Sequence, residues 1–133
     1  MHDGLAKTDC LSNLIIGAAI EVHRDKGPGL LESIYAWCLE CELSLRKLSF
    51  ESQRSVVVSY KGFVRREPLR FDLLVAGSVL VERKATAELL PIHRAQLLSY
   101  MKLLNVPIGL LINFNATRLA DGLARLILKN ANQ

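Results

Sequence analysis

Two acidic residues and a lysine stand in a β-rich segment near the middle of the chain. Asp72 lies within 69–75, and Glu82 and Lys84 form a Glu-x-Lys at the end of 79–84. Side chains alternate between the two faces of a strand, so Glu82 and Lys84 project side by side. The sequence therefore predicts one strand face that carries a carboxylate and an ammonium group.

The turn between the two strands decides whether Asp72 joins that pair. If Ala76-Gly77-Ser78 is a three-residue loop, Asp72 sits opposite Glu82 on the same face. A two-residue loop sends Asp72 to the other face unless a bulge restores it. The site hypothesis thus requires the longer loop or a bulge. Along its own strand, Asp72 is then expected to face away from Phe71, Leu73 and Val75.

Two carboxylates and a lysine on one face suit metal-assisted phosphodiester chemistry. Hard oxygen ligands favour Mg²⁺ or Mn²⁺, which neutralise phosphate charge and lower the pKa of a bound water. Lys84 would orient that water or stabilise the developing negative charge. The alternative is a solvated charged face, because a Glu-x-Lys is common in strands.

A polar stripe on the following helix adds candidates. His93, Gln96 and Tyr100 follow one another at i, i+3 and i+7, so they share one side of a helix over 92–104. Packed near the carboxylates, this stripe would complete a site. Alone, it is an ordinary exposed helix face.

The elements that must position these residues follow from periodicity and turn signals. Gly27-Pro28-Gly29 separates two helical stretches, and valine-rich or wholly apolar runs mark the strands. The order α-α-β-β-β-α-β-α predicts one α/β domain over 1–133, a mixed sheet flanked by helices. The expected helices are 8–23, 30–47, 92–104 and 117–129, and the expected strands are 54–61, 69–75, 79–84 and 108–113.

Composition narrows the functional classes. Half of the 133 residues are hydrophobic and 23% are charged, as in globular proteins, and the formal charge is +4. This mild basic bias is compatible with a polyanionic partner. The longest apolar run is far too short to span a bilayer, and no cleavable leader is evident. A cytoplasmic protein without a membrane partner and with three free cysteines is expected.

Several motifs together resemble one family. Gly29-Leu30-Leu31-Glu32-Ser33-Ile34-Tyr35 matches G-x-x-E-x-x-Y, and Asp72, the Glu-x-Lys and Gln96-x-x-x-Tyr100 follow in order. Over about 11–127 the chain resembles the GxxExxY proteins, small members of the PD-(D/E)XK nuclease-like superfamily. The resemblance implies a restriction-endonuclease-like fold.

The resemblance also implies roles. Asp72 and Glu82 look like metal-binding acids, Glu32 like a third acid that reaches the metal from the first helices, and Lys84 like the catalytic lysine. Gln96 and Tyr100 match the Q-x-x-x-Y of the RecB-like branch, where that helix supports the site and contacts substrate. His23 and Asn113 also match, without an assignable role. Two residues depart from the superfamily pattern: Phe71 stands in place of its proline, and Arg83 stands in the middle of the Glu-x-Lys, where an aliphatic residue is commoner. The charge of Arg83 must therefore face away from the core or pair with a partner.

The expected function is a Mg²⁺- or Mn²⁺-dependent nuclease, with DNA favoured over RNA as substrate. Arg70 and Arg94, together with Arg65 and Arg66, are candidate phosphate contacts. Two alternatives stay open: a nuclease fold that binds nucleic acid without turnover, and a protein-interaction module. A homodimer or a recruiting protein would fit a domain this small.

Overall fold

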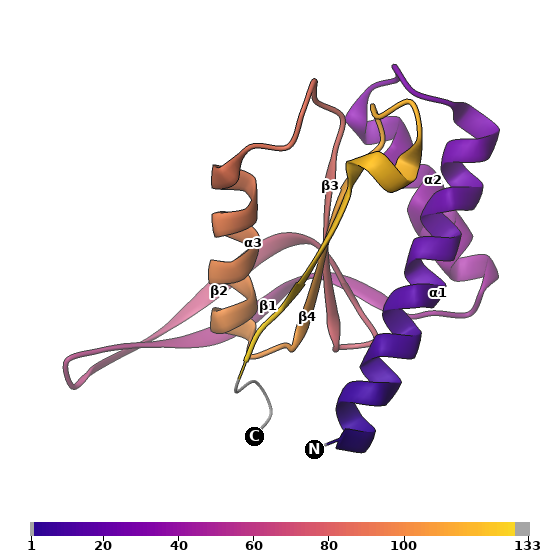
Figure 1. Cartoon of the computed structure of the whole chain (residues 1–133). Helices are drawn as coiled ribbons and strands as arrows, with labels where there is room; N and C mark the ends of the chain where they lie inside the picture. Colours follow the sequence, from indigo (N-terminus) through magenta and orange to yellow (C-terminus); the bar gives the residue numbers. More distant parts are fainter. Residues whose placement is uncertain (1, 130–133) are drawn as a thin grey trace.

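The computed structural model describes residues 2–129 as a five-stranded mixed sheet with helices on both faces (Figure 1). The strands lie in the order β1-β2-β3-β4-β5, and only β3 and β4 run parallel. The α/β class expected from the sequence is confirmed. The elements are α1 (His2–Lys26), α2 (Glu32–Leu45), β1 (Phe50–Tyr60), β2 (Phe63–Val75), β3 (Val79–Lys84), α3 (Pro91–Leu104), β4 (Ile108–Asn113), η1 (Leu119–Gly122) and β5 (Leu123–Ile127).

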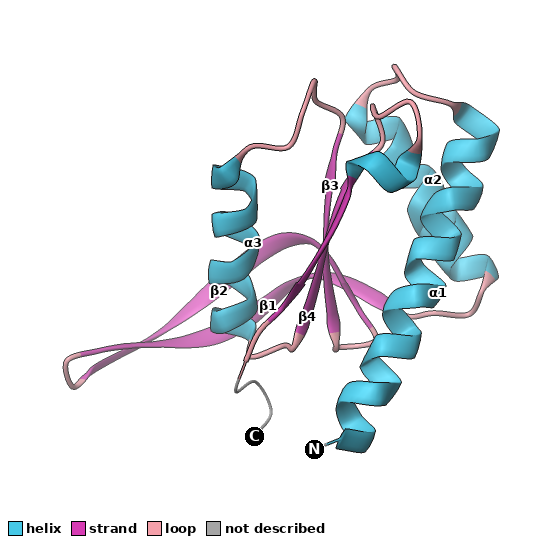
Figure 2. Cartoon of the chain, viewed as in Figure 1, coloured by secondary structure: helices cyan, strands magenta, loops and turns pink. Residues whose placement is uncertain are grey.

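Strand β4 lies inside the sheet, between β3 and β5, and all six of its residues are buried. Parallel strands need a crossover connection, which α3 supplies between β3 and β4. Helices α1 and α2 cover one face and α3 covers the other (Figure 2). The apolar run 108–113 is therefore a strand buried on both faces, as predicted.

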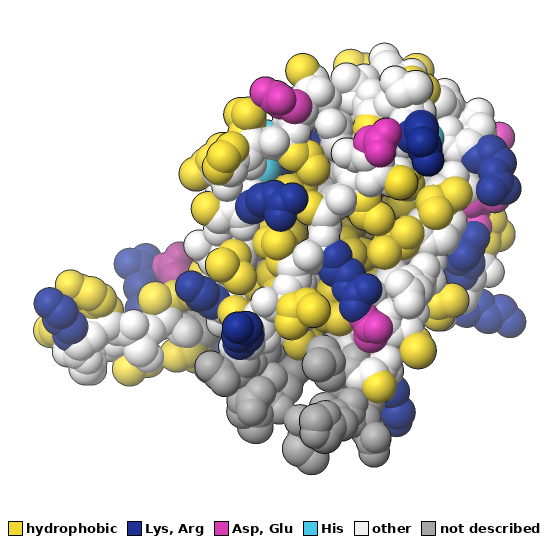
Figure 3. Space-filling model, in the orientation of Figure 1, with side chains coloured by type: hydrophobic (Ala, Val, Ile, Leu, Met, Phe, Trp, Pro, Cys, Tyr) yellow, Lys and Arg dark blue, Asp and Glu magenta, His cyan; other side chains and the backbone are white. Residues whose placement is uncertain are grey.

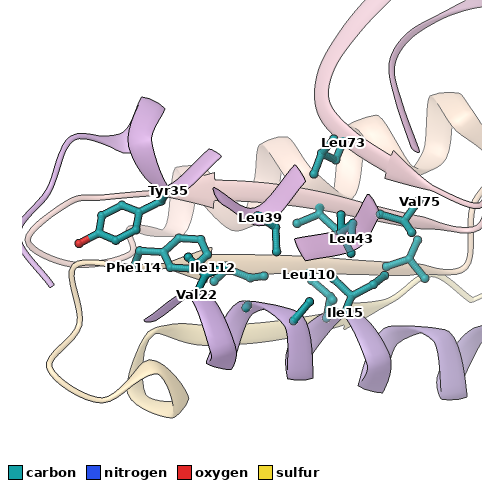
Figure 4. Close-up of a cluster of buried hydrophobic side chains, with 14 of the residues drawn as sticks. Ile15, Val22, Tyr35, Leu39, Leu43, Leu73, Val75, Leu110, Ile112 and Phe114 are labelled. Atoms are coloured by element: carbon teal, nitrogen blue, oxygen red, sulfur yellow. The ribbon is translucent and has the colours of Figure 1, made fainter. Parts of the chain in front are cut away.

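One core lies between the sheet and the α1–α2 layer, and Tyr35 lies at one end of it, on the left in Figure 4. The ring of Tyr35 stacks on Phe114 with centroids 4.8 Å apart. Its hydroxyl donates to the carbonyl of Gly27 at 2.5 Å and accepts from the Leu30 backbone N–H at 3.0 Å. Gly29 has a φ of +97°, which favours glycine. Gly29 and Tyr35 thus build the α1–α2 turn and the core.

A second core lies beneath α3, and it contains Phe71. The expectation that Phe71 shares a face with Leu73 and Val75 is wrong, because those two residues belong to the first core. The pairing of β1 with β2 shifts register between Glu51 and Gln53. This irregularity lets Phe71 turn toward α3.

The helix expected over 117–129 is also wrong. The chain forms the short 3₁₀ helix η1 and then β5, which pairs antiparallel with β4. Gly122 lies so close to Asn113 that a Cβ there would be 2.5 Å from the Asn113 carbonyl oxygen. A glycine within a helix-like pattern was the available sign that the helix does not continue.

Within residues 2–129, every helix is too short or too polar to be a membrane-spanning segment. The three cysteines are free thiols. Cys10 is exposed, and Cys38 and Cys41 are partly buried on α2.

Candidate active site

The turn between β2 and β3 is the three-residue loop that the site hypothesis requires. Val75 pairs with Val79, and Leu73 pairs with Val81. Continuing this register brings Asp72 to Glu82. The Asp72 Oδ2 atom accepts a hydrogen bond from the backbone N–H of Arg83 at 2.7 Å. The hairpin therefore fixes the first acid beside the Glu-x-Lys.

Arg83 supplies the support beneath that pair. Arg83 is 7% exposed, and its side chain points toward α2, where Nη1 donates to the Glu40 carboxylate at 2.9 Å and to the Ala36 carbonyl at 3.0 Å. Its Nη2 donates to the Asp72 carbonyl at 3.4 Å. The charge that the sequence left without a partner is thus paired, and it links α2 to β2 and β3.

Glu82 and Lys84 project to the opposite face, toward the α3 layer. The Lys84 Nζ atom lies 3.9 Å from Glu82 Oε2, and both side chains are mostly buried. Burial and, next, the charge of Asp72 raise the pKa of Glu82 to about 7, against the smaller opposing effect of Lys84. Two carboxylates therefore share a confined site in which ionisation of both is unfavourable.

These acids open into a pocket of about 300 Å³. Asp72 and Glu82 line it from the β2–β3 hairpin, and Gln96 and Tyr100 line it from α3. The pocket is completed by Arg70, whose side chain is exposed, and by Phe71. The structure thus unites five of the residues singled out in the sequence. Phe71 also lines the pocket. The sequence did not predict this position, because it depends on the register shift between β1 and β2.

Other candidates lie outside this pocket. Glu32 is exposed in the first turn of α2, and Arg94 is exposed on α3. His93 accepts a hydrogen bond from the Leu90 backbone N–H at 3.0 Å, so it caps the start of α3. Arg65 pairs with Glu67 and Arg66 donates to Ser55, both on the β1–β2 hairpin.

Asn113 and His23 hold the loops around the carboxyl ends of β3 and β4. The Asn113 Oδ1 atom accepts from the backbone N–H groups of Thr86 and Asn115, and its Nδ2 donates to the Thr86 carbonyl. The His23 Nε2 atom lies 2.8 Å from the Ala116 carbonyl oxygen. Both residues therefore stabilise these loops through hydrogen bonds to the backbone, a role that their spacing in the sequence did not reveal.

The mixed sheet with acids and a lysine at its β2–β3 hairpin defines an α/β protein of nuclease-like fold. Residues 9–126 match the family model described as the PD-(D/E)XK nuclease superfamily, and the chain belongs to that superfamily. Comparisons with curated proteins and with solved structures found no significant match.

Proposed function

We propose that this protein is a divalent-metal-dependent nuclease that hydrolyses phosphodiester bonds of DNA or RNA. The observation that carries the proposal is the convergence of Asp72 and Glu82 in one pocket, with Lys84 beside them. Membership of the PD-(D/E)XK nuclease superfamily supports the same reaction class. We also propose that the chain belongs to the GxxExxY proteins of the RecB-like branch, on the motifs given above.

The two carboxylates fit a hard cation such as Mg²⁺, which keeps several waters and is commonly held by one or two carboxylates. The charge of Asp72 helps raise the pKa of Glu82, and a cation between them would offset that repulsion. Among the described residues, no cluster of three or more acidic, histidine or cysteine side chains forms a ready ligand set. Glu32 accordingly stays a proposed third ligand. A bound Mg²⁺ or Mn²⁺ would neutralise phosphate charge and acidify a water.

The chain's own side chains divide the remaining work. Lys84 presents an ammonium group that would donate a hydrogen bond to the attacking water or to a phosphate oxygen. Gln96 and Tyr100 line the same pocket as the acids, from α3, and would position the scissile phosphate. Arg70 at the pocket mouth, and Arg94 further along α3, would contact flanking phosphates.

A cleavage assay tests this function. Single-stranded and duplex DNA and RNA would be incubated with the protein and Mn²⁺ or Mg²⁺. Wild type and Lys102→Ala, which removes an exposed lysine from α3, are expected to cleave one of these substrates. Lys84→Ala is expected to lose at least about 100-fold in rate. Equal rates for Lys84→Ala and wild type, or no cleavage of any substrate by wild type, would contradict the proposal.

A further inference from the structure

The β1–β2 hairpin extends well beyond the rest of the sheet (Figure 2). Strand β2 pairs with β3 only over Leu73–Val75, whereas its pairing with β1 continues to Tyr60 and Phe63. Residues 53–60 and 63–70 therefore form a two-stranded ribbon. Its base is anchored because Val56 is buried in the core beneath α3, and Val58 and Leu69 pack there. We call this ribbon with its turn, residues 53–70, the arm; its outer half projects from the sheet.

The tip of this arm is apolar and exposed. Lys61 and Gly62 form a two-residue turn with φ values of 47° and 89°, which places Tyr60 directly opposite Phe63. Tyr60 is 66% exposed and Phe63 is 78% exposed. The Lys61 ammonium lies 5.2 Å from the Tyr60 ring centroid. A tight turn thus presents two aromatic rings and a cation to solvent.

The arm also carries the net charge of the protein. Residues 53–70 hold five of the 17 lysines and arginines but one of the 13 acidic residues, a formal balance of +4. The remainder of the chain has twelve of each sign, so the whole-chain charge of +4 resides on this ribbon. Basic and hydrophobic side chains are seen side by side on it in Figure 3. The cations are Arg54, Lys61, Arg65, Arg66 and Arg70, of which Arg54 is ion-paired with Glu51 and Arg65 with Glu67.

We propose that the β1–β2 hairpin is a nucleic-acid-binding arm. It contacts the polymer at a second place, remote from the catalytic pocket, while the pocket holds the bond to be cleaved. Arginines would contact phosphates, and the aromatic tip would stack on bases or pack in a groove, since a two-stranded ribbon fits the major groove. Strand β2 leads directly from the tip to Asp72, and Arg70 lines the pocket. The identity of the ligand rests on the proposed function.

The length of β2 sets the reach of this arm. Nine residue steps separate Phe63 from Asp72, which is about 30 Å along an extended strand. About nine base pairs at roughly 3.4 Å each would cover that distance. Oligonucleotides much shorter than this cannot occupy the pocket and the tip together. Affinity should therefore rise with substrate length up to about this size.

Binding measured without cleavage tests the arm. Fluorescence anisotropy in EDTA would follow binding of labelled 6- and 20-base-pair duplexes and of matching single strands over a range of salt concentrations. Arg65→Gln/Arg66→Gln is expected to bind the 20-mers at least about tenfold more weakly and to reduce the magnitude of the salt slope by about 2. Tyr60→Ser/Phe63→Ser is expected to lose about fivefold or more without changing that slope. Both pairs should lose less affinity for the 6-mers than for the 20-mers, because a 6-mer cannot contact the tip and the pocket together.

The matched control is Lys102→Gln/Arg118→Gln, which removes two exposed cations outside the arm. Equal losses in the control and in Arg65→Gln/Arg66→Gln, or wild-type binding by both arm variants, would overturn the inference. A dimer of wild type in sedimentation that Tyr60→Ser/Phe63→Ser abolishes would overturn it too, since the tip would then cover a second copy. Circular dichroism melting checks that each variant is folded.

The outcomes separate this inference from the proposed nuclease activity. Cleavage by wild type, with unchanged binding by the arm variants, would contradict the role of the arm and support the nuclease activity. Arm-dependent binding without cleavage of any substrate would contradict the nuclease activity and support the role of the arm. Absence of all nucleic-acid binding by wild type would overturn the inference.

Discussion

The carboxylate of Asp72 accepts a 2.7 Å hydrogen bond from the backbone N–H of Arg83, the residue between Glu82 and Lys84. This bond fixes the acid of one strand against the Glu-x-Lys of the next. The Arg83 side chain leaves the opposite face of the strand and is held by Glu40 and Ala36. Backbone and side chain of one residue therefore connect the acidic pocket to α2.

Arg83 is expected to be a main source of stability under the site. Arg83→Leu would leave the Ala36 and Asp72 carbonyls without this donor and would lower the free energy of unfolding by about 2–4 kcal/mol. Glu40→Gln keeps a polar partner at a half-exposed position and is expected to cost about 1 kcal/mol or less. Urea unfolding followed by circular dichroism measures both. Equal, small effects of the two substitutions would show that Arg83 does not connect these layers.

The raised pKa of Glu82 gives a stability effect of defined sign. Its folded-state pKa of about 7 lies above the ordinary value of 4.5, so the folded protein binds more protons than the unfolded chain between these values. The stability contributed by protonated Glu82 is complete below about pH 4.5 and is lost as the pH rises through 7.

Glu82→Gln removes the loss of stability at high pH, because a glutamine side chain does not ionise. The variant is expected to match wild type near pH 4.5 and to exceed it by roughly 2 kcal/mol at pH 8 in metal-free buffer. Paired urea titrations at the two pH values measure the difference. Glu88→Gln, on the exposed loop before α3, serves as the control and should show no such trend. A constant difference between Glu82→Gln and wild type from pH 4.5 to 8 would contradict the assignment.

Asn113 is expected to stabilise the loop that follows Lys84. Asn113→Asp keeps the oxygen that accepts from Thr86 and Asn115 but loses the donor to the Thr86 carbonyl. Asn113→Ala loses all three bonds at a buried position, so it should cost about 2–3 kcal/mol. Asn113→Asp should also destabilise the protein, because its second carboxylate oxygen would face the Thr86 carbonyl oxygen. Thermal and urea unfolding measure both losses. A loss well below about 1 kcal/mol for Asn113→Ala would mean that the carboxamide bonds do not stabilise this loop.

Sequence patterns were reliable where burial or turn chemistry determines the structure. The wholly apolar run 108–113 became a strand covered on both faces. The three-residue loop Ala76-Gly77-Ser78, one of the two loop lengths that the sequence left open, sets the register that unites Asp72 with Glu82. Residues 117–129 have good helix formers, yet β5 forms there because it satisfies the free edge of β4. Tertiary pairing therefore outweighed local propensity.

Parts of the site depend on contacts that a linear pattern does not contain. The register shift near Glu51 turns Phe71 into the pocket wall, and no local signal marks it. Arg83 finds Glu40 more than forty positions away in the chain. Glu32 matched a motif, but it stands exposed at the start of α2, where its role as a ligand stays a prediction.

Joint binding of a divalent cation by Asp72 and Glu82 is the central claim. Calorimetric titration of Mn²⁺ at pH 8, where Glu82 is ionised, tests it most directly. Wild type and Asp121→Ala, an exposed acid on η1, are expected to bind one class of site with equal affinity. Asp72→Ala and Glu82→Ala should each weaken binding at least tenfold. Undiminished Mn²⁺ binding in either variant, or no binding in wild type, would contradict the claim.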